Sequence, residues 1–134
     1  MVKKVKKDDK RALTAKLQKL ANLHARLRDC SGKDGGTNCI SCGTYYEFAK
    51  FHGGHFIPST KSAVRFEETN IHAQCISCNL FHHGNQINYM IAMEKRYGRQ
   101  YVDELIEKSR AIKAWTVEEL NELIEYYKTK IRNY

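Results

Sequence analysis

Two Cys-x-x-Cys pairs constrain the fold of this chain more than any other feature of its sequence. Cys39-Ile-Ser-Cys42 and Cys75-Ile-Ser-Cys78 are separated by 32 residues. The two-residue gap lets both thiolates of a pair reach one ion, and two pairs complete the tetrahedral sulfur shell that zinc accepts. Because four sulfur ligands leave no open coordination position, we predict a structural zinc ion whose loss unfolds the middle of the chain. The alternative is four buried thiols, and Cys30 is expected to be a free cysteine.

Length and composition describe an ordinary globular protein whose charge is unevenly distributed. The chain has 134 residues and a net charge of +8, and its length predicts a single domain over 1–134. Residues 1–38 carry a net charge of +7 and residues 39–134 carry +1. The basic first third favours contact with a polyanion, most simply nucleic acid, and the alternative is a solubilising tail. Neither a membrane-spanning run nor the apolar stretch of a secretory signal is present, so we expect an intracellular protein with no membrane partner.

Apolar residues at helical spacing predict helices at both ends of the chain. Over 8–29, leucines recur at steps of three and four with Lys and Arg between them, which predicts a basic amphipathic helix. Thr116 followed by Glu119 is a capping box and predicts the start of the last helix. Another helix is expected over 101–109, and the helix before it should stop at Gly98. The predicted buried stripe of that earlier helix consists of Ile87, Met90, Ile91 and Tyr97.

The segment between the cysteine pairs has the features of a short, irregular β-hairpin. Aromatic and β-branched residues occur in short runs over 44–70, interrupted by Gly53-Gly54 and by Pro58. A loop rich in Gly and Ser over 31–38 precedes this segment. A helix is expected to begin near Cys75 or Ser77 and to be interrupted at Gly84.

Histidines are concentrated around the second cysteine pair. Five of the six lie between positions 52 and 83, and four cysteines already saturate one zinc ion, so the histidines are spare. Asn79 and His83 are four residues apart, which places both on one face of a helix. His55 on the hairpin is expected to face them, and the three side chains could seat a divalent ion and a water. The simplest expectations for the neighbours are that His72 is packed and that Phe81 lies in the core under the zinc.

These residues occur in the order of a known nuclease motif. His55, Asn70 and the Cys78-Asn79 pair resemble the ββα-metal, or HNH, motif in its four-cysteine form. A longer resemblance is to the NinG (Rap) recombination proteins of lambda-type phages, and it rests on RLRD (26–29), CISCG (39–43), GHF (54–56), VRFEETNIHAQCISCN (64–79), GN (84–85) and WTVEEL (115–120).

The resemblance implies a fold and an activity. The fold class is α+β, with a zinc-stabilised, treble-clef-like ββα-metal core over 39–85, an N-terminal helix over 8–29 and two to three C-terminal helices over 86–134. The activity is that of an endonuclease cutting branched recombination DNA, such as Holliday junctions and D-loops. A phage-encoded protein of this kind would work in the cytoplasm of the host cell.

The resemblance also implies a role for each site residue. His55 would be the general base, Asn79 a ligand of a catalytic Mg²⁺ or Mn²⁺ ion, and the amide of Asn70 would pin the hairpin loop and so aim His55. His83 and His52 are further candidate ligands of the ion. The candidate DNA contacts are Arg65, Lys61, Arg26 and Arg28.

Position 54 departs from the motif. HNH proteins usually carry Asp or His directly before the base, and this chain has Gly54. His52 could substitute, but on a regular strand residues 52 and 55 point to opposite faces. A bulge or bend at Gly53-Gly54 would bring them together, and glycine permits one.

A partner and a rival function complete the expectations. Four-way junctions have two-fold symmetry, so a resolving nuclease would be a homodimer, with the helices carrying Leu13–Leu27 and Leu120–Ile131 as candidate interfaces. The rival is a treble-clef zinc module that binds DNA or a recombination partner without cutting. A nuclease of another specificity, such as a homing or restriction enzyme, would share the same active site.

Overall fold

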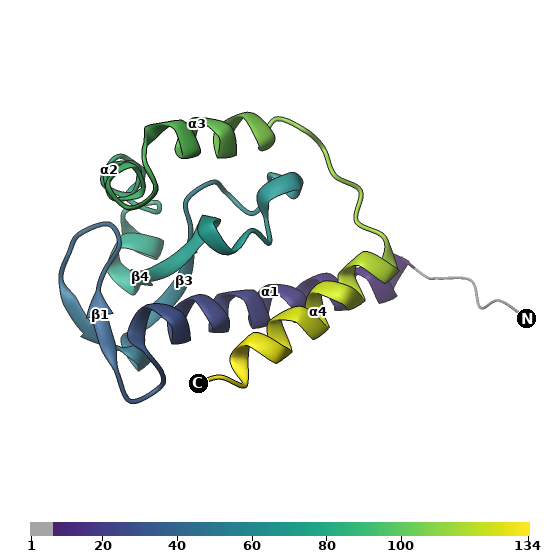
Figure 1. The fold of residues 1–134 in the computed structure, drawn as a ribbon, viewed down its shortest axis with the longest axis horizontal. Helices are drawn as coiled ribbons and strands as arrows, with labels where there is room; N and C mark the ends of the chain where they lie inside the picture. The colour runs from purple at the N-terminus through teal and green to yellow at the C-terminus, as the bar shows by residue number, and fades with distance from the viewer. Residues whose placement is uncertain (1–6) are drawn as a thin grey trace, which may run out of the picture.

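A computed structural model describes residues 7–134 of the chain, with side chains from Asp9 onward. The first six residues, which contain part of the predicted basic run, lie outside the described residues. The elements in chain order (Figure 1) are α1 (Lys7–Cys30), β1 (Gly36–Asn38), β2 (Tyr45–Glu47), η1 (Phe48–Lys50), β3 (Phe51–His55), η2 (Ser62–Val64), η3 (Glu68–Asn70), β4 (Ile71–Cys75), η4 (Ser77–Phe81), α2 (Gln86–Tyr97), α3 (Arg99–Lys108) and α4 (Val117–Ile131). The mixed α+β class is confirmed, whereas the treble-clef detail and the single-domain organisation stay predictions.

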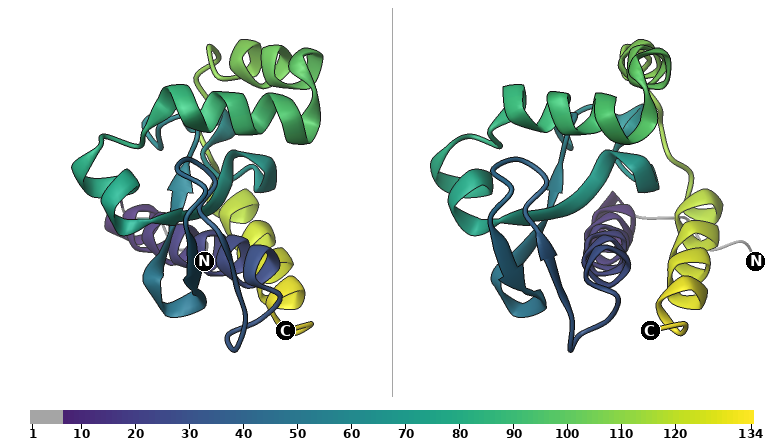
Figure 2. Two further views of the ribbon diagram at one scale, coloured as in Figure 1. Left: turned by 90° about the vertical axis from the view of Figure 1, so that its left-hand side faces the viewer. Right: turned by 60° about the vertical axis from the view of Figure 1, so that its left-hand side comes forward.

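Helix α1 is the predicted basic amphipathic helix, and it lies between the β3–β4 hairpin and α4 (Figure 2). Its stripe of Leu17, Ala21 and Ala25 packs against Leu120 and Ile124 of α4. The apolar faces predicted to form a dimer interface therefore cover one another within the chain. Two amphipathic helices of one chain can bury their stripes against each other, and the homodimer itself stays a prediction.

The structure contains two β-hairpins among the described residues, where the sequence predicted one. Strands β1 and β2 pair around the first cysteine pair, and β3 pairs antiparallel with β4. Strand β4 covers 71–75, immediately before the helix that was expected near Cys75. That helix begins as the π-helix η4, and the chain then turns through Gly84, whose φ is +84°, before α2 begins.

The pairing of β3 with β4 is regular and has no bulge at Gly53-Gly54. His52 pairs with Gln74, Gly54 with His72 and His55 with Ile71, without a slip in register. The bulge or bend that would bring His52 and His55 together is therefore absent from this strand. Both glycines serve close packing instead: a Cβ at Gly53 would lie 2.7 Å from the Cβ of Asn22 in α1, and a Cβ at Gly54 would lie 2.0 Å from Gln74 Oε1.

Helix α2 buries a different face from the predicted one. Tyr89 and Met93 are fully buried, whereas Ile87 is 80% exposed and Ile91 is 47% exposed. Both sets have helical spacing, so periodicity alone could not choose between them. The Tyr89 hydroxyl donates a 2.7 Å hydrogen bond to the carbonyl of Gly54, which turns this face of α2 toward the sheet. Phe81, expected in the core, is 73% exposed.

The C-terminal elements follow their local signals closely. The capping box is present: Glu119 N donates to Thr116 Oγ1 and Thr116 N donates to Glu119 Oε1, each at 3.1 Å. Gly98, at φ +86°, ends α2 as predicted. Helices α2 and α3 pack together on the loop that follows β3. None of the helices in the described part of the chain has the length and apolar character needed to cross a membrane.

Candidate functional site

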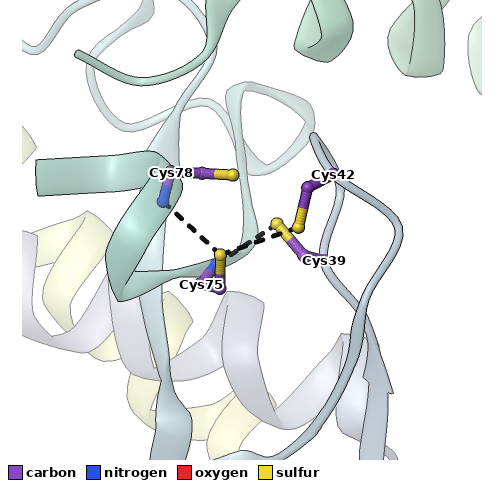
Figure 3. A group of neighbouring side chains, drawn as sticks. All are labelled: Cys39, Cys42, Cys75 and Cys78. Carbon is purple, nitrogen blue, oxygen red and sulfur yellow. Dashed lines mark hydrogen bonds between the residues drawn. The ribbon is translucent and has the colours of Figure 1, made fainter. Parts of the chain in front are cut away.

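The two cysteine pairs converge on one point (Figure 3). Their four Sγ atoms lie within 4.8 Å of one another. The second pair joins the end of β4 to η4, and the Cys75 and Cys78 amides donate to the sulfurs of Cys39 (3.3 Å) and Cys75 (3.4 Å). Such N–H donors stabilise thiolates, so the arrangement fits the structural zinc ion that the sequence predicted. Cys30 is buried nearby and does not belong to this cluster.

Asn79, immediately after the last cysteine, contacts His52. Helix η4 carries Asn79 against β3, where its Nδ2 lies 3.0 Å from Nδ1 of His52. Side chains two apart on a strand share a face, so His52 lies on the same face as position 54, where HNH proteins carry an acidic or histidine ligand. The partner of Asn79 is therefore His52 and not His55, contrary to the arrangement expected from the sequence.

The His52–Asn79 pair fits a divalent ion in its donor chemistry. Both side chains are partly exposed, one offers an imidazole nitrogen, and rotation of the Asn79 amide presents its Oδ1 in place of Nδ2. An imidazole nitrogen and an amide oxygen are both ligands of divalent transition ions. The donor set carries no charge, which distinguishes it from a site with a carboxylate ligand.

His55 lies on the other face of β3. Its Nε2 is 3.0 Å from the carbonyl oxygen of Arg65, and because a carbonyl only accepts hydrogen bonds, Nε2 carries the proton. Burial lowers the pKa of His55 below its ordinary value. The hydrogen bond to the Arg65 carbonyl raises this pKa and the charge of Arg65 lowers it, but burial has the largest effect. The ring is therefore neutral near pH 7, and its Nδ1 can accept a proton.

Asn70 is the best-anchored side chain of the expected set. It is fully buried; its Oδ1 accepts from Ile57 N at 2.8 Å, and its Nδ2 donates to the carbonyls of Ile57 (2.9 Å) and Val64 (3.2 Å). The amide thus ties together both ends of the loop that follows His55. The contacts agree with the position that the resemblance implies for Asn70, and its role toward His55 stays a prediction.

His83 lies outside helix η4, in an exposed turn at φ +49°. It therefore does not stand one helical turn after Asn79, as the four-residue spacing had suggested. The sequence predicted an interruption of the helix at Gly84, but η4 already ends at Phe81, so His83 lies beyond it. Its role as a ligand stays a prediction.

The four candidate DNA contacts fall into two groups. Lys61 is exposed, and Arg65 is partly exposed with its Nε donating to Gln18 Oε1 at 2.8 Å. Arg26 instead stacks on the ring of Phe48 at 4.2 Å, and Arg28 donates to the carbonyls of Glu68 (3.0 Å) and Ile71 (2.7 Å). These internal contacts occupy Arg26 and Arg28, as the bond to Gln18 occupies Arg65, so Lys61, which is exposed, is the best placed of the four to bind a phosphate.

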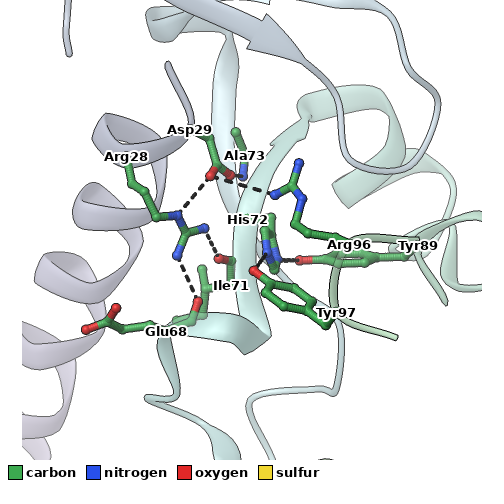
Figure 4. A network of polar contacts seen from close by, with 10 residues as sticks. Arg28, Asp29, Glu68, Ile71, His72, Ala73, Tyr89, Arg96 and Tyr97 are labelled. Atoms are coloured by element: carbon green, nitrogen blue, oxygen red, sulfur yellow. Dashed lines mark hydrogen bonds and ion pairs between the residues drawn. The ribbon is translucent and has the colours of Figure 1, made fainter. Parts of the chain in front are cut away.

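A buried polar network under β4 was missed by sequence reasoning (Figure 4). His72 is fully buried, with Nδ1 3.0 Å from the hydroxyl of Tyr89 and Nε2 2.7 Å from that of Tyr97. The Tyr89 proton goes to the carbonyl of Gly54, so His72 donates through Nδ1 and accepts through Nε2 from Tyr97. Burial lowers the pKa of His72 to about 3. The expectation of a packed His72 is confirmed.

Asp29 anchors the other side of this network. Its Oδ2 accepts from the amide of Ala73 at 2.8 Å, and its Oδ1 pairs with Arg28 at 2.9 Å. Burial raises the pKa of Asp29, but the hydrogen bond and charge of Arg28 and the Ala73 amide together bring it below its ordinary value. Both residues belong to the RLRD segment at 26–29, which the sequence marked only through the family resemblance.

Comparison with known proteins gives a consistent family. A family model described as Bacteriophage Lambda NinG protein matches residues 1–134. The chain is 36% identical over 102 residues to a protein ninG of Escherichia phage 933W, covering 75% of this chain and 50% of the relative. It is 35% identical over 102 residues to that of Escherichia phage lambda, covering 75% of this chain and 49% of the relative. The chain thus spans about half the length of these curated relatives, and no solved structure matches it.

Proposed function

Because the chain belongs to the NinG family, we propose that it is a metal-dependent DNA endonuclease that cuts branched recombination intermediates, such as Holliday junctions and D-loops. The observation that carries the proposal is the placement of three side chains around one hairpin. His55 ends β3, Asn70 ties the loop that follows it, and Asn79 projects from the helical turn after the zinc cysteines. A zinc module that only binds DNA has no need of this arrangement.

The proposed chemistry divides between the two faces of β3. His55 holds its proton on Nε2 toward the Arg65 carbonyl, which leaves Nδ1 to take a proton from the attacking water. His52 and Asn79 would hold Mg²⁺ or Mn²⁺, which supplies charge stabilisation for the scissile phosphate and the departing 3′ oxygen. Arg65 and Lys61 would contact the flanking phosphates, so that binding weakens steeply with salt.

A homodimer remains the natural partner arrangement for paired cuts on a two-fold symmetric junction. Its interface would not use the α1 and α4 stripes, which are already buried. The exposed apolar residues of η4 and α2 are available instead: Leu80, Phe81, Ile87 and Ile91.

One observation favours the rival function. Position 54 is glycine, so the carboxylate or imidazole that HNH proteins usually carry there is missing. A zinc module that binds branched DNA or a recombination partner without cutting would show the same cysteine cluster and the same basic charge. The nuclease and the non-cutting zinc module differ in one outcome: only the nuclease cleaves a phosphodiester, and it needs His55 to do so.

The experiment uses a labelled four-way junction and a linear duplex, each incubated with the zinc-loaded protein and with Mg²⁺ or Mn²⁺. We expect metal-dependent cutting of the junction that is lost in His55→Ala and kept in His82→Ala, a matched change at an exposed histidine. Tight junction binding without cutting in either metal would favour the rival.

A further inference from the structure

Gln74 has a buried oxygen without a partner. The residue is fully buried, and its Nε2 donates to the carbonyl of Gly84 at 2.6 Å and to Ser41 Oγ at 2.9 Å. Its Oε1 is equally buried, and within residues 7–134 no donor bonds to it. Leaving such an acceptor unsatisfied costs on the order of 1–3 kcal/mol. A bound group that interacts with this oxygen would remove that cost.

The orientation of the amide is fixed. The carbonyl of Gly84 can only accept a hydrogen bond, so the nitrogen of Gln74 must lie on that side and the oxygen on the other. A flipped amide would place two acceptors 2.6 Å apart. Oε1 is therefore held toward Gly54, where a Cβ would lie 2.0 Å from it.

This position relates Gln74 directly to the proposed ion site. Gln74 is the cross-strand partner of His52, so the two side chains share a face of the hairpin, and Asn79 contacts His52 on that face. Oε1 occupies the space that a side chain at position 54 would enter. An amide oxygen from β4 therefore stands where HNH proteins place a ligand from β3.

We propose that Gln74 supplies, through Oε1, a third ligand to the divalent ion held by His52 and Asn79, and that Gly54 is glycine in order to admit it. This inference rests on the proposed function, since it concerns the ion of the same site. The resulting donor set is one imidazole and two amide oxygens, all uncharged. Imidazole favours transition ions, whereas Mg²⁺ prefers carboxylate and water oxygens. The site should therefore take Mn²⁺ in preference to Mg²⁺.

The test measures Mn²⁺ binding by zinc-loaded protein in the absence of DNA, from the electron paramagnetic resonance signal of the free ion. Gln74→Met keeps the length of the side chain and removes its oxygen. We expect roughly 10-fold weaker Mn²⁺ binding or more. Gln100→Met is the matched control, because it makes the same change at an exposed glutamine of α3, and its Mn²⁺ affinity should equal that of the parent. Unchanged Mn²⁺ binding by a folded Gln74→Met protein would overturn the proposal.

A second measurement uses the unchanged protein and does not depend on the folding of a variant. Diamagnetic Mg²⁺ added to ¹⁵N-labelled, zinc-loaded protein shifts the side-chain amide signals of residues whose amide oxygens bind the ion. We expect the Gln74 and Asn79 signals to shift together over one titration, and an unmoved Gln74 signal beside a shifted Asn79 signal would exclude Gln74 as a ligand.

The two proposals can fail separately. Mn²⁺ bound through Gln74 without cutting of any junction would refute the nuclease and leave the ligand standing. Normal cutting together with normal Mn²⁺ binding in Gln74→Met would refute only the ligand.

Discussion

Asn79 contacts His52, at 3.0 Å, on the face of β3 opposite to the one that carries His55. The group that takes the proton and the groups that hold the ion therefore belong to different surfaces of one strand. In the proposed enzyme the two tasks should be separable by mutation, which gives the first prediction.

His52→Ala and His55→Ala are both expected to abolish junction cutting, but for different reasons. His52→Ala removes an ion ligand and should weaken Mn²⁺ binding by about 10-fold or more. His55→Ala leaves His52 and Asn79 in place and should bind Mn²⁺ like the parent. Calorimetric titration of both zinc-loaded variants checks this, and equal losses of binding would show that one surface serves both tasks.

Asn70→Asp tests the tie across the loop after His55. Aspartate can still accept from Ile57 N, but it cannot donate to the carbonyls of Ile57 and Val64. Two buried acceptors lose their donor, so we expect a loss of about 2–4 kcal/mol in the free energy of unfolding. Urea denaturation measures it. The control is Asn88→Asp on the exposed face of α2, which should change stability by no more than about 0.5 kcal/mol.

The buried His72 should make stability depend on pH. Its pKa is about 3 in the folded protein, whereas the ordinary pKa of a histidine is 6.5, so between these two values the unfolded chain binds the extra proton. Stability is fully present above about pH 6.5 and falls with decreasing pH, by up to roughly 1.4 kcal/mol per pH unit.

Comparison with His72→Gln isolates this contribution, because zinc release at low pH affects both proteins alike. Urea denaturation at pH 7, 6 and 5 should show the parent losing stability faster than the variant. Parallel losses would mean that His72 is not the group responsible.

Removal of zinc should unfold the middle of the chain. The four thiols come from the β1–β2 turn, the end of β4 and η4, so one ion would join segments that lie far apart in the sequence. A strong chelator, or Cys39→Ser, is expected to reduce the far-ultraviolet circular dichroism and the zinc content together. Cys30→Ser should retain one zinc ion per chain, and loss of zinc in that variant would contradict the assignment of the ligands.

The buried face of α2 predicts opposite outcomes at two apolar positions. Met93→Ala, at a fully buried site, should cost about 2–5 kcal/mol of stability. Ile87→Lys, at a site 80% exposed, should change it by no more than about 0.5 kcal/mol. Thermal denaturation of both proteins distinguishes this face from the stripe that periodicity had suggested.

Features encoded by neighbouring residues were predictable from sequence. The capping box at Thr116 and Glu119 and the stop at Gly98 depend on contacts within one helical turn, and both are present. The cysteine cluster was predictable because zinc prescribes both the residue type and the spacing.

Features that depend on distant partners were not predictable. Strand β4 is buried throughout, from Ile71 to Cys75, so it lacks the alternation that marks a half-buried strand. The pairing of Asn79 with His52 follows from the pleat of β3, which puts His52 on the face of position 54. Sequence reasoning identified the opposite orientations of His52 and His55 but assumed that both had to reach the same ion.

The packing of α1 on α4 has a consequence for how the protein is made. Helix α1 ends at Cys30 and α4 begins at Val117, so 86 residues must be synthesised between them. At about 5–20 residues per second, the ribosome needs roughly 4–17 s to cover that interval. During that time α4 is absent, so the apolar stripe of α1 around Leu17 stays uncovered. An uncovered apolar stripe on a nascent chain can aggregate or bind chaperones.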